Sequence, residues 1–343
     1  MIEIHSKFRL QDQKIKSVAE LFASVSTNFP EHESFLRELF NDEHEIKVQT
    51  SGSTGKPKMI RLDKKMLIYS AKNTIDFFDL KPASKTLLNL SSEYIAGKMM
   101  WIRALTGGWH LDITEPRSEI KIQKKYDFGA MIPMQVFQSL KYLEHFKKLI
   151  VGGGQTSYEL RQKIKGLTVK IYATYGMTET ATHIAIKPLN TEANKNFYQS
   201  DSLRDAFRIF DEIHISKDDR DCLQIYAPKL LEKPIVTNDV VEILDDKHFR
   251  WLGRYDYVVN SGGIKLHPEQ IEEKLRSLIS RRFFIAGKPD AKLGEKLILL
   301  IEGDSYPVNQ MAFKKVLKKY EMPKEIIFIK QLQETPNGKL KRS

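Results

Sequence analysis

Short apolar runs alternate along the first half of the chain with stretches that have helical spacing. Residues 45–50 (EIKVQT) alternate apolar and polar positions as in a half-buried strand, and residues 66–78 (MLIYSAKNTIDFF) place their apolar positions on one helical face. Buried strands are predicted at 86–90 (TLLNL), at 148–151 ahead of three glycines, and at 168–176 (TVKIYATYG). This alternation predicts an α/β fold built in layers.

The pattern changes between about residues 207 and 251, where turn signals separate short alternating strands. This stretch predicts a β-rich subdomain at the end of a large N-terminal domain, residues 1–254. The remaining residues, 255–343, hold their own helices and strands. They predict a small α+β C-terminal domain.

Two helices are predicted in the C-terminal domain, at 267–279 and at 309–320. Asn309 is the expected cap of the second helix, whose apolar face comprises Ala312, Phe313, Val316, Leu317 and Tyr320. Strands are predicted at 283–287, 296–302 and 325–329.

Composition adds little that is specific. The 343 residues are 41% apolar, and Lys plus Arg exceed Asp plus Glu by 55 to 44, a net charge of +11. That charge suits either nucleic acid or small polyanionic ligands. The lysines fall in short clusters within amphipathic stretches, which is typical of solvated helix faces, so charge alone does not indicate nucleic-acid binding.

The apolar runs, the first residues and the cysteine content indicate a cytoplasmic protein without membrane insertion. We expect it to be a monomer or a homodimer. No apolar run approaches the roughly 18 residues of a membrane span, and the first residues (MIEIHSKFRLQDQK) are too polar for a signal peptide. The one cysteine, Cys222, excludes an internal disulfide and a cysteine-rich zinc site. Its apolar neighbours predict a buried side chain.

The segment TSGSTGKPK has the composition of a phosphate cradle. Its glycines let successive backbone amides face an anion, its hydroxyls add donors, and its lysines add charge. An ordinary polar hairpin loop is the alternative, whereas a Walker-type loop is unlikely because Pro57 follows Lys56 and no helix pattern opens there. The nucleotide-binding residues predicted here are Thr50, Ser51, Gly52, Ser53, Thr54, Gly55, Lys56 and Lys58.

Further motifs follow in a fixed order: VGGG from Val151, YGMTET from Tyr175, TNDVVEI from Thr237, WLGRYDYVVNSGGIKLHPEQIE from Trp251, and PNGKLKR from Pro336. Together with TSGSTGKPK they resemble the motif series of the adenylate-forming superfamily of acyl-CoA synthetases, peptide-synthetase adenylation domains and luciferases. The resemblance implies a large N-terminal adenylation domain, a mobile C-terminal domain, and ATP, Mg²⁺ and coenzyme A as ligands.

The resemblance gives the YGMTET segment the role of a nucleotide and magnesium site. Tyr175 offers an aromatic face to adenine, Thr178 a hydroxyl to phosphate oxygens, and Glu179 a carboxylate to magnesium. Read alone, the segment is equally well a strand end and a helix cap. The neighbouring backbone positions expected at the nucleotide are Gly152, Gly153, Gly154, Gly176 and Met177.

Asp239 matches the acidic residue that takes both ribose hydroxyls in the family, although Asn238 stands where a glycine is usual. Arg254 resembles the arginine on the ribose and phosphate side, and Asp256 the hinge between the domains. A surface ion pair is the alternative explanation for Arg254 and Asp256.

Lys339 resembles the catalytic lysine of the mobile domain, which neutralises charge when a carboxylate attacks the α-phosphate. Lys341 and Arg342 lie close enough to confuse this assignment, and a frayed basic tail is the alternative. After a domain rotation, Ser261, Gly262 and Gly263 would line the thiol channel. No carrier domain is evident, so free coenzyme A is the expected acceptor.

The acid substrate is indicated by two further features. About fifty residues precede the phosphate loop, and residues 91–105 (SSEYIAGKMMWIRAL) resemble compact o-succinylbenzoate:CoA ligases of menaquinone biosynthesis, with a truncated N-terminal subdomain. Lys98 or Arg103 would then neutralise a second carboxylate, with Tyr94 and His183 as further acyl-pocket residues. Lys98 is equally well explained as a cation whose stem packs on apolar neighbours.

The sequence leaves other readings open. Another acyl- or aryl-CoA ligase of the superfamily is the first alternative, and a basic nucleic-acid-binding protein is a remote one. A noncatalytic adenylate-binding relative is disfavoured because Glu179 and Lys339 are both retained.

Overall fold

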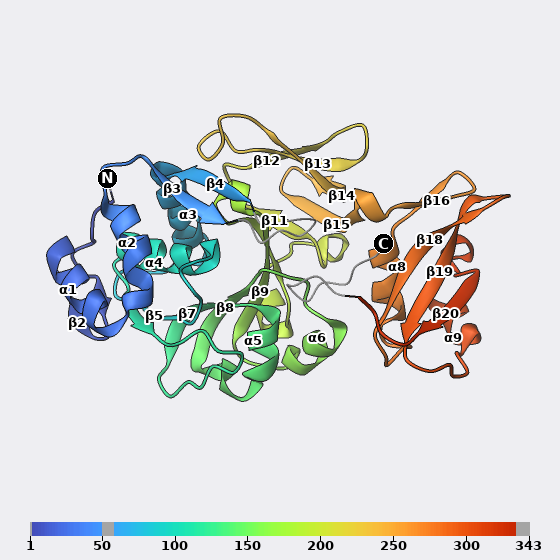
Figure 1. Cartoon of the computed structure of the whole chain (residues 1–343), viewed down its shortest axis with the longest axis horizontal. Coiled ribbons are helices and arrows are strands. Elements are labelled where there is room, and N and C mark those ends of the chain that lie inside the picture. The colour runs from blue at the N-terminus through green and yellow to red at the C-terminus, as the bar shows by residue number, and fades with distance from the viewer. Residues whose placement is uncertain (1, 50–57, 334–343) are drawn as a thin grey trace. The chain divides into compact units, whose positions relative to one another are not determined.

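The computed structural model describes residues 2–49 and 58–333, which divide into two compact units (Figure 1). The first holds the residues up to His214 together with Tyr226–Pro234, and the second holds Ile215–Ile225 and the residues from Ile235 onward. The domain boundary predicted at residue 254 stays a prediction.

A mostly parallel sheet forms the centre of the first unit, in the strand order β11-β10-β9-β8-β7-β5-β6-β1-β2. Strands β1, β6, β5, β7, β8 and β9 run parallel, whereas β2, β10 and β11 are antiparallel to their neighbours. The strands are β1 (Arg9–Leu10), β2 (Gln13–Lys14), β5 (Lys85–Leu88), β6 (His110–Ile113), β7 (Tyr126–Met131), β8 (Phe146–Val151), β9 (Lys170–Gly176), β10 (His183–Pro188) and β11 (Phe207–Ile209).

Helices connect and cover these strands. Figure 1 shows α5 beside α6 and α3 beside α4. The helices are α1 (Val18–Asn28), α2 (Glu33–Phe40), α3 (Lys64–Phe77), α4 (Ile95–Gly107), α5 (Pro133–Gln138), α6 (Tyr158–Ile164) and α7 (Thr191–Asn194), with 3-10 turns η1 (Pro30–His32), η2 (Leu140–His145), η3 (Thr178–Thr180) and η4 (Asp201–Leu203). The strands β3 (Glu45–Gln49) and β4 (Met59–Asp63) pair antiparallel as a separate ribbon.

Two apolar groups hold the sheet between its helices. Val136 of α5 and Leu160 of α6 join Leu149 and Ile171 of the sheet in one buried cluster. Phe78, at the end of α3, packs its ring against other aromatic rings of the sheet, Phe128 and Tyr172, at centroid distances of 5.4 and 5.2 Å. Burial of such side chains contributes about 1.5–3 kcal/mol each and fixes the strand ends that carry the site.

The second unit contains a β-rich part and a small α+β part. The β-rich strands lie in the order β12 (His214–Lys217), β13 (Cys222–Tyr226), β14 (Ile235–Asp245) and β15 (His248–Arg254), followed by the turn η5 (Tyr255–Tyr257). The second sheet has the order β17-β16-β19-β18 with β20 beside β19. Its elements are β16 (Val259–Ser261), β17 (Ile264–Leu266), α8 (Pro268–Leu275), β18 (Phe283–Asp290), β19 (Gly294–Glu302), α9 (Gln310–Val316), η6 (Lys319–Glu321) and β20 (Glu325–Ile329).

The predicted α/β class is confirmed, but the last predicted helix is too long. Asn309 caps α9 through a bond from the Ala312 amide, as expected, and Phe313 is buried. The helix ends at Val316 because Leu317 adopts an extended backbone (ψ 143°). Tyr320, expected on the buried face, is 59% exposed.

The Cys222 side chain is buried, as its apolar neighbours predicted. Within residues 2–49 and 58–333, no helix has both the length and the apolar character needed to cross a membrane.

Asn190 offers a test of the polar part of the core. Its side-chain amide accepts from the Ile171 and Ala193 N–H groups and donates to the Leu167 and Val169 carbonyls. Asn190→Ala therefore removes a hydrogen-bond partner from four backbone groups. We expect the free energy of unfolding in urea to fall by about 2–4 kcal/mol.

Asn194→Ala is the matched control, because the Asn194 Oδ1 atom is buried and has no hydrogen-bond partner among residues 2–49 and 58–333. It should change the free energy of unfolding by less than about 1 kcal/mol. Equal losses in the two variants would contradict the role given to Asn190.

Candidate functional site

The carboxyl ends of β8 and β9 place two glycine-bearing segments at one edge of the sheet. Gly152 follows β8 and donates its N–H to the Met131 carbonyl at 3.2 Å. A Cβ on Gly152 would lie 2.6 Å from Thr174 Oγ1, and one on Gly176 would lie 2.2 Å from the Thr182 carbonyl oxygen. Gly153 has φ +81°, whereas Gly154 has room for a side chain. Ligands of parallel α/β sheets bind outside this edge.

The turn after β9 holds Glu179 toward solvent. Thr180 Oγ1 accepts from the Met177 N–H at 3.1 Å and donates to the Thr182 carbonyl at 2.6 Å, which fixes the backbone around Thr178 and Glu179. Glu179 is exposed, and its carboxylate forms no hydrogen bond or ion pair with another described residue. A carboxylate held in this way suits a magnesium ion that keeps most of its waters.

Tyr175, which we expect at the adenine, lies half-buried at the end of β9. The centre of its ring is 5.6 Å from that of Phe207.

The turn after β9 also contains a non-glycine residue with positive φ, Ala181 at +62°. Ala181 is fully buried. Such a backbone costs about 1–3 kcal/mol and persists where the surroundings enforce it.

Arg103 and His183 lie together, as members of one buried hydrogen-bonded ring. Arg103 Nε donates to Thr74 Oγ1 at 3.3 Å, and Arg103 NH2 donates to Thr182 Oγ1 at 3.4 Å. His183 closes the ring, with Nε2 at 3.2 Å from Thr74 Oγ1 and Nδ1 at 3.3 Å from Thr182 Oγ1. Thr74 comes from α3, Arg103 from α4 and His183 from the start of β10, and Thr182 lies in the turn just before β10.

Within residues 2–49 and 58–333, no carboxylate forms an ion pair with Arg103. Its partners in the described part of the chain are the two hydroxyls and the Met100 sulfur, 3.9 Å from NH1. Arg103 is 2% exposed, and burial lowers its pKa to about 9. Burial, followed by the nearby Arg103 charge, also holds the pKa of His183 well below 6.5, so the imidazole is neutral.

Lys98 and Tyr94 do not join this ring. Lys98 is buried with Nζ 4.5 Å from the centre of the Phe35 ring of α2, and burial lowers its pKa. This contact matches the packing explanation of Lys98. Tyr94 precedes α4 and is 52% exposed.

In the second unit, Asp239 and Arg254 face each other on β14 and β15. Asp239 Oδ1 accepts from Trp251 Nε1 at 3.1 Å and lies 3.8 Å from Arg254 NH1. Arg254 NH2 in turn donates to Asp256 Oδ2 at 2.9 Å. The predicted ribose, phosphate and hinge residues are thus one connected polar group.

Asn238, which replaces the usual glycine, takes part in this group. Its Nδ2 donates to Asp256 Oδ1 at 3.3 Å, and its Oδ1 accepts from Arg220 NH1 at 3.0 Å. The departure from the family pattern therefore supplies contacts at the predicted hinge.

Ser261 ends β16, and Gly262 and Gly263 form the turn to β17. Their φ values are +60° and +80°. Two successive positive values require glycine in a tight hairpin turn. The structure thus gives Ser261, Gly262 and Gly263 a rigid turn, while their place in a thiol channel stays a prediction.

Several predicted residues lie outside the described part of the chain. These are the catalytic lysine Lys339, its neighbours Lys341 and Arg342, and the loop residues Thr50, Ser51, Gly52, Ser53, Thr54, Gly55 and Lys56. Lys58 is described, exposed, just ahead of β4.

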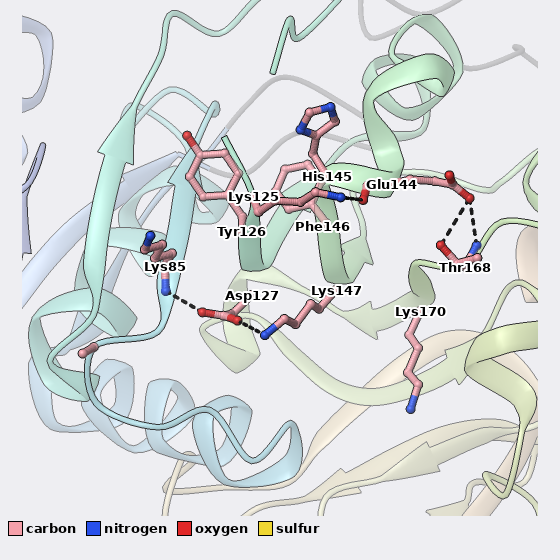
Figure 2. A pocket seen from close by; sticks show the side chains of 11 residues that line it. Lys85, Lys125, Tyr126, Asp127, Glu144, His145, Phe146, Lys147, Thr168 and Lys170 are labelled. Atoms are coloured by element: carbon pink, nitrogen blue, oxygen red, sulfur yellow. Dashed lines mark hydrogen bonds and ion pairs between the residues drawn. The ribbon is translucent and has the colours of Figure 1, made fainter. Parts of the chain in front are cut away.

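A hollow of about 710 Å³ opens at the opposite edge of the sheet, where β5, β7, β8 and β9 begin. Figure 2 shows that its acidic groups already have partners: Asp127 with Lys147 at 2.8 Å, and Glu144 with Thr168 at 3.2 Å. The hollow lies at the amino ends of the strands, so we do not assign the chemistry to it.

Sequence reasoning missed Thr74 and Thr182. No motif includes Thr74, which lies on one face of an ordinary amphipathic helix. The only available signal was a buried-face hydroxyl four residues after Ser70, and that signal is common.

The buried His183 predicts a pH dependence of stability. Below pH 6.5 the unfolded chain binds a proton at this imidazole that the folded chain does not, so the free energy of unfolding falls as pH falls. This one imidazole contributes at most about 1.4 kcal/mol per pH unit to the slope of the free energy of unfolding against pH. The free energy of unfolding in urea should fall between pH 6.5 and pH 5.5 by about 1 kcal/mol less in His183→Gln than in the wild type.

The exposed His214→Gln is the control and should retain the wild-type slope. A wild-type slope in His183→Gln would contradict a neutral, buried imidazole.

Comparison with known proteins identifies the family and the fold. The sequence profile described as AMP-binding enzyme matches residues 48–201. A crystal structure of an acyl-CoA synthetase (AMP-forming)/AMP-acid ligase II-like protein from Dyadobacter fermentans is 32% identical and covers 91% of this chain and 93% of that one, with a TM-score of 0.61.

A 2-succinylbenzoate–CoA ligase from Listeria monocytogenes is 24% identical over 323 residues, 86% of this chain and 68% of that protein. The o-succinylbenzoate CoA synthetase of Bacillus subtilis, solved with its acyl-adenylate intermediate, shares the fold at 16% identity and a TM-score of 0.71, over 86% of this chain and 67% of that one. The profile match, the Dyadobacter relative and the ordered motifs lead to one conclusion: the chain belongs to the AMP-binding enzyme family, within the adenylate-forming superfamily.

Proposed function

We propose that the chain is an AMP-forming acid:CoA ligase whose acid carries a second carboxylate, with o-succinylbenzoate as the substrate. The observation that carries this proposal is Arg103, a buried guanidinium surrounded by neutral partners. The relatives named 2-succinylbenzoate–CoA ligase support the choice of acid.

A buried cation without a counterion is costly. The effective penalty for removing one ion from water is several kcal/mol, and two hydroxyls and a thioether return only part of it. Folding alone gives no reason to keep an arginine here, since an apolar side chain of similar volume would pack at lower cost. A ligand carboxylate supplies the missing charge.

The geometry of Arg103 indicates which of its atoms receive that carboxylate. Nε is occupied by Thr74, whereas the described part of the chain offers NH1 only the Met100 sulfur, a weak acceptor. A carboxylate therefore binds bidentately across NH1 and NH2. Because Arg103 is 2% exposed, the Met100 side chain moves aside on binding, which its flexible, unbranched thioether makes easy.

The reacting carboxylate is activated at the carboxyl edge of the sheet. The residues fit ATP and its metal: Gly152 and Gly176 leave no room for a Cβ beside their neighbours, and Glu179 is exposed without a partner among the described residues. Glu179 would hold Mg²⁺, which when bound neutralises phosphate charge. Tyr175 would contact adenine, Thr178 phosphate oxygens, and Asp239 the ribose hydroxyls.

Transfer to coenzyme A follows in this proposal after a rotation about Asp256, a hinge held by Arg254 and Asn238. The rotation withdraws Lys339 and presents Ser261, Gly262 and Gly263 to the thiol. We place the reaction in the cytoplasm, as a step of menaquinone biosynthesis.

The first test measures AMP release with ATP, magnesium and coenzyme A. We expect selective turnover of o-succinylbenzoate over benzoate, acetate and a medium-chain fatty acid. Arg103→Met should raise the KM for o-succinylbenzoate about 100-fold, the scale of removing one partner of a buried charge pair.

The companion variant Lys98→Met decides between the two cations of α4. Because Lys98 packs on Phe35, its replacement should leave that KM within about twofold. A large rise in Lys98→Met with none in Arg103→Met would overturn the assignment, and equal turnover of benzoate would remove the second carboxylate from the account.

Lys339→Ala separates the half-reactions. The rate of adenylate formation should fall about 10²- to 10³-fold, as for loss of one preorganised stabilising contact. Thioester formation from preformed acyl-adenylate should largely survive, because no charge then builds on an attacked phosphate. Equal losses in the two half-reactions, measured by rapid quench, would show that the role given to Lys339 is wrong.

A further inference from the structure

Thr74 is the point at which Arg103, His183 and helix α3 meet. Its Oγ1 atom donates to the Ser70 carbonyl at 3.2 Å, accepts from Arg103 Nε at 3.3 Å, and lies 3.2 Å from His183 Nε2. The residue is fully buried. A threonine hydroxyl has one hydrogen and two lone pairs, so these three contacts use its full capacity.

The proton positions in the ring follow from this count. The Thr74 hydrogen goes to Ser70, and Arg103 is always a donor, so His183 Nε2 donates to the remaining lone pair of Thr74. His183 Nδ1 is then the acceptor, and it receives the hydroxyl hydrogen of Thr182 at 3.3 Å. Thr182 Oγ1 keeps its lone pairs for Arg103 NH2.

With all five bonds made and the His183 imidazole neutral, the ring has a single proton arrangement, and each group has a fixed direction. The guanidinium is held at Nε and at one hydrogen of NH2. The hydrogens left without a strong acceptor belong to NH1 and NH2, the pair of nitrogens that matches a carboxylate. The ring thus aims Arg103 as well as burying it.

We propose that Thr74 is a positioning residue that sets the site's preference for acids with a second carboxylate, because its hydroxyl fixes Arg103 at Nε and leaves NH1 and NH2 for the ligand. The proposal rests on the function proposed above. Thr74 does not touch the acid. It acts through Arg103, with His183 and Thr182 holding the other side of the ring.

A purely structural role for Thr74 makes a different prediction. Threonine often bonds the carbonyl four residues earlier in its helix, as Thr74 does with Ser70, and such a bond needs no ligand. A structural role would lower stability and affect all acids alike. A positioning role affects only acids that present a carboxylate to Arg103.

The experiment compares o-succinylbenzoate with two analogues that each lack one of its carboxylates, 4-oxo-4-phenylbutanoate and 2-butanoylbenzoate. The KM is measured for the diacid, and inhibition constants are measured for the analogues. Thr74→Val, which keeps the shape and removes the hydroxyl, should raise the KM about tenfold, the scale of one bond to a charged group. It should weaken binding of the analogue whose carboxylate contacts Arg103 to a similar extent. The inhibition constant of the other analogue should not change.

Two further variants guard against misfolding. Thr74→Ser retains the hydroxyl and should restore the wild-type KM, and Thr182→Val should reproduce the selective loss by removing the acceptor of NH2. Thr106→Val is the matched control, because Thr106 lies on α4 and its buried hydroxyl has no hydrogen-bond partner in the part of the chain that the structure describes. The KM and the inhibition constants of Thr106→Val should equal those of the wild type.

The outcomes separate the two proposals. If the wild type fails to distinguish the diacid from either analogue, the proposed acid is wrong and the role of Thr74 falls with it. If the wild type does distinguish them but Thr74→Val weakens both analogues equally, or Thr74→Ser gives no rescue, the function stands and the positioning role is wrong.

Discussion

The account depends on one electrostatic constraint: a guanidinium buried among groups that carry no charge. Arg103 contacts two hydroxyls and a sulfur, and the neighbouring His183 is kept neutral by burial and by the arginine itself. The folded chain thus holds a positive charge that its own described residues do not compensate. Such a site is stable enough to fold, yet it gains a large free energy when an anion of matching shape arrives.

The parallel sheet explains how this cation can serve a reaction. The glycines after β8 and β9 and the turn with Glu179 lie at the carboxyl edge, and the same turn continues through Thr182 and His183 into β10. A few residues of chain therefore connect the expected metal ligand to the ring around Arg103. Thr182 of this segment contacts Arg103, and His183 contacts the Arg103 partner Thr74, whereas Arg103 itself comes from α4.

Individual strands, helices and caps could be predicted from the sequence where their signals are local. The strands before Gly152 and Gly176 and the cap at Asn309 follow from neighbouring residues alone. The ring around Arg103 could not be predicted, since Thr74 is 29 residues away and Thr182 is 79. The ambiguity between Lys98 and Arg103 had the same cause: only packing puts Lys98 on Phe35. The predicted length of α9 was wrong because the apolar spacing continues to Tyr320, whereas the backbone becomes extended at Leu317.

Acid-dependent exchange of pyrophosphate into ATP tests the central claim most directly, because it needs neither coenzyme A nor the second half-reaction. The account predicts rapid exchange with o-succinylbenzoate, exchange slower by about tenfold or more with an acid that lacks the carboxylate held by Arg103, and loss of that difference in Arg103→Met. Equal exchange with diacid and monoacids in the wild type, or no exchange with any carboxylic acid, would contradict it.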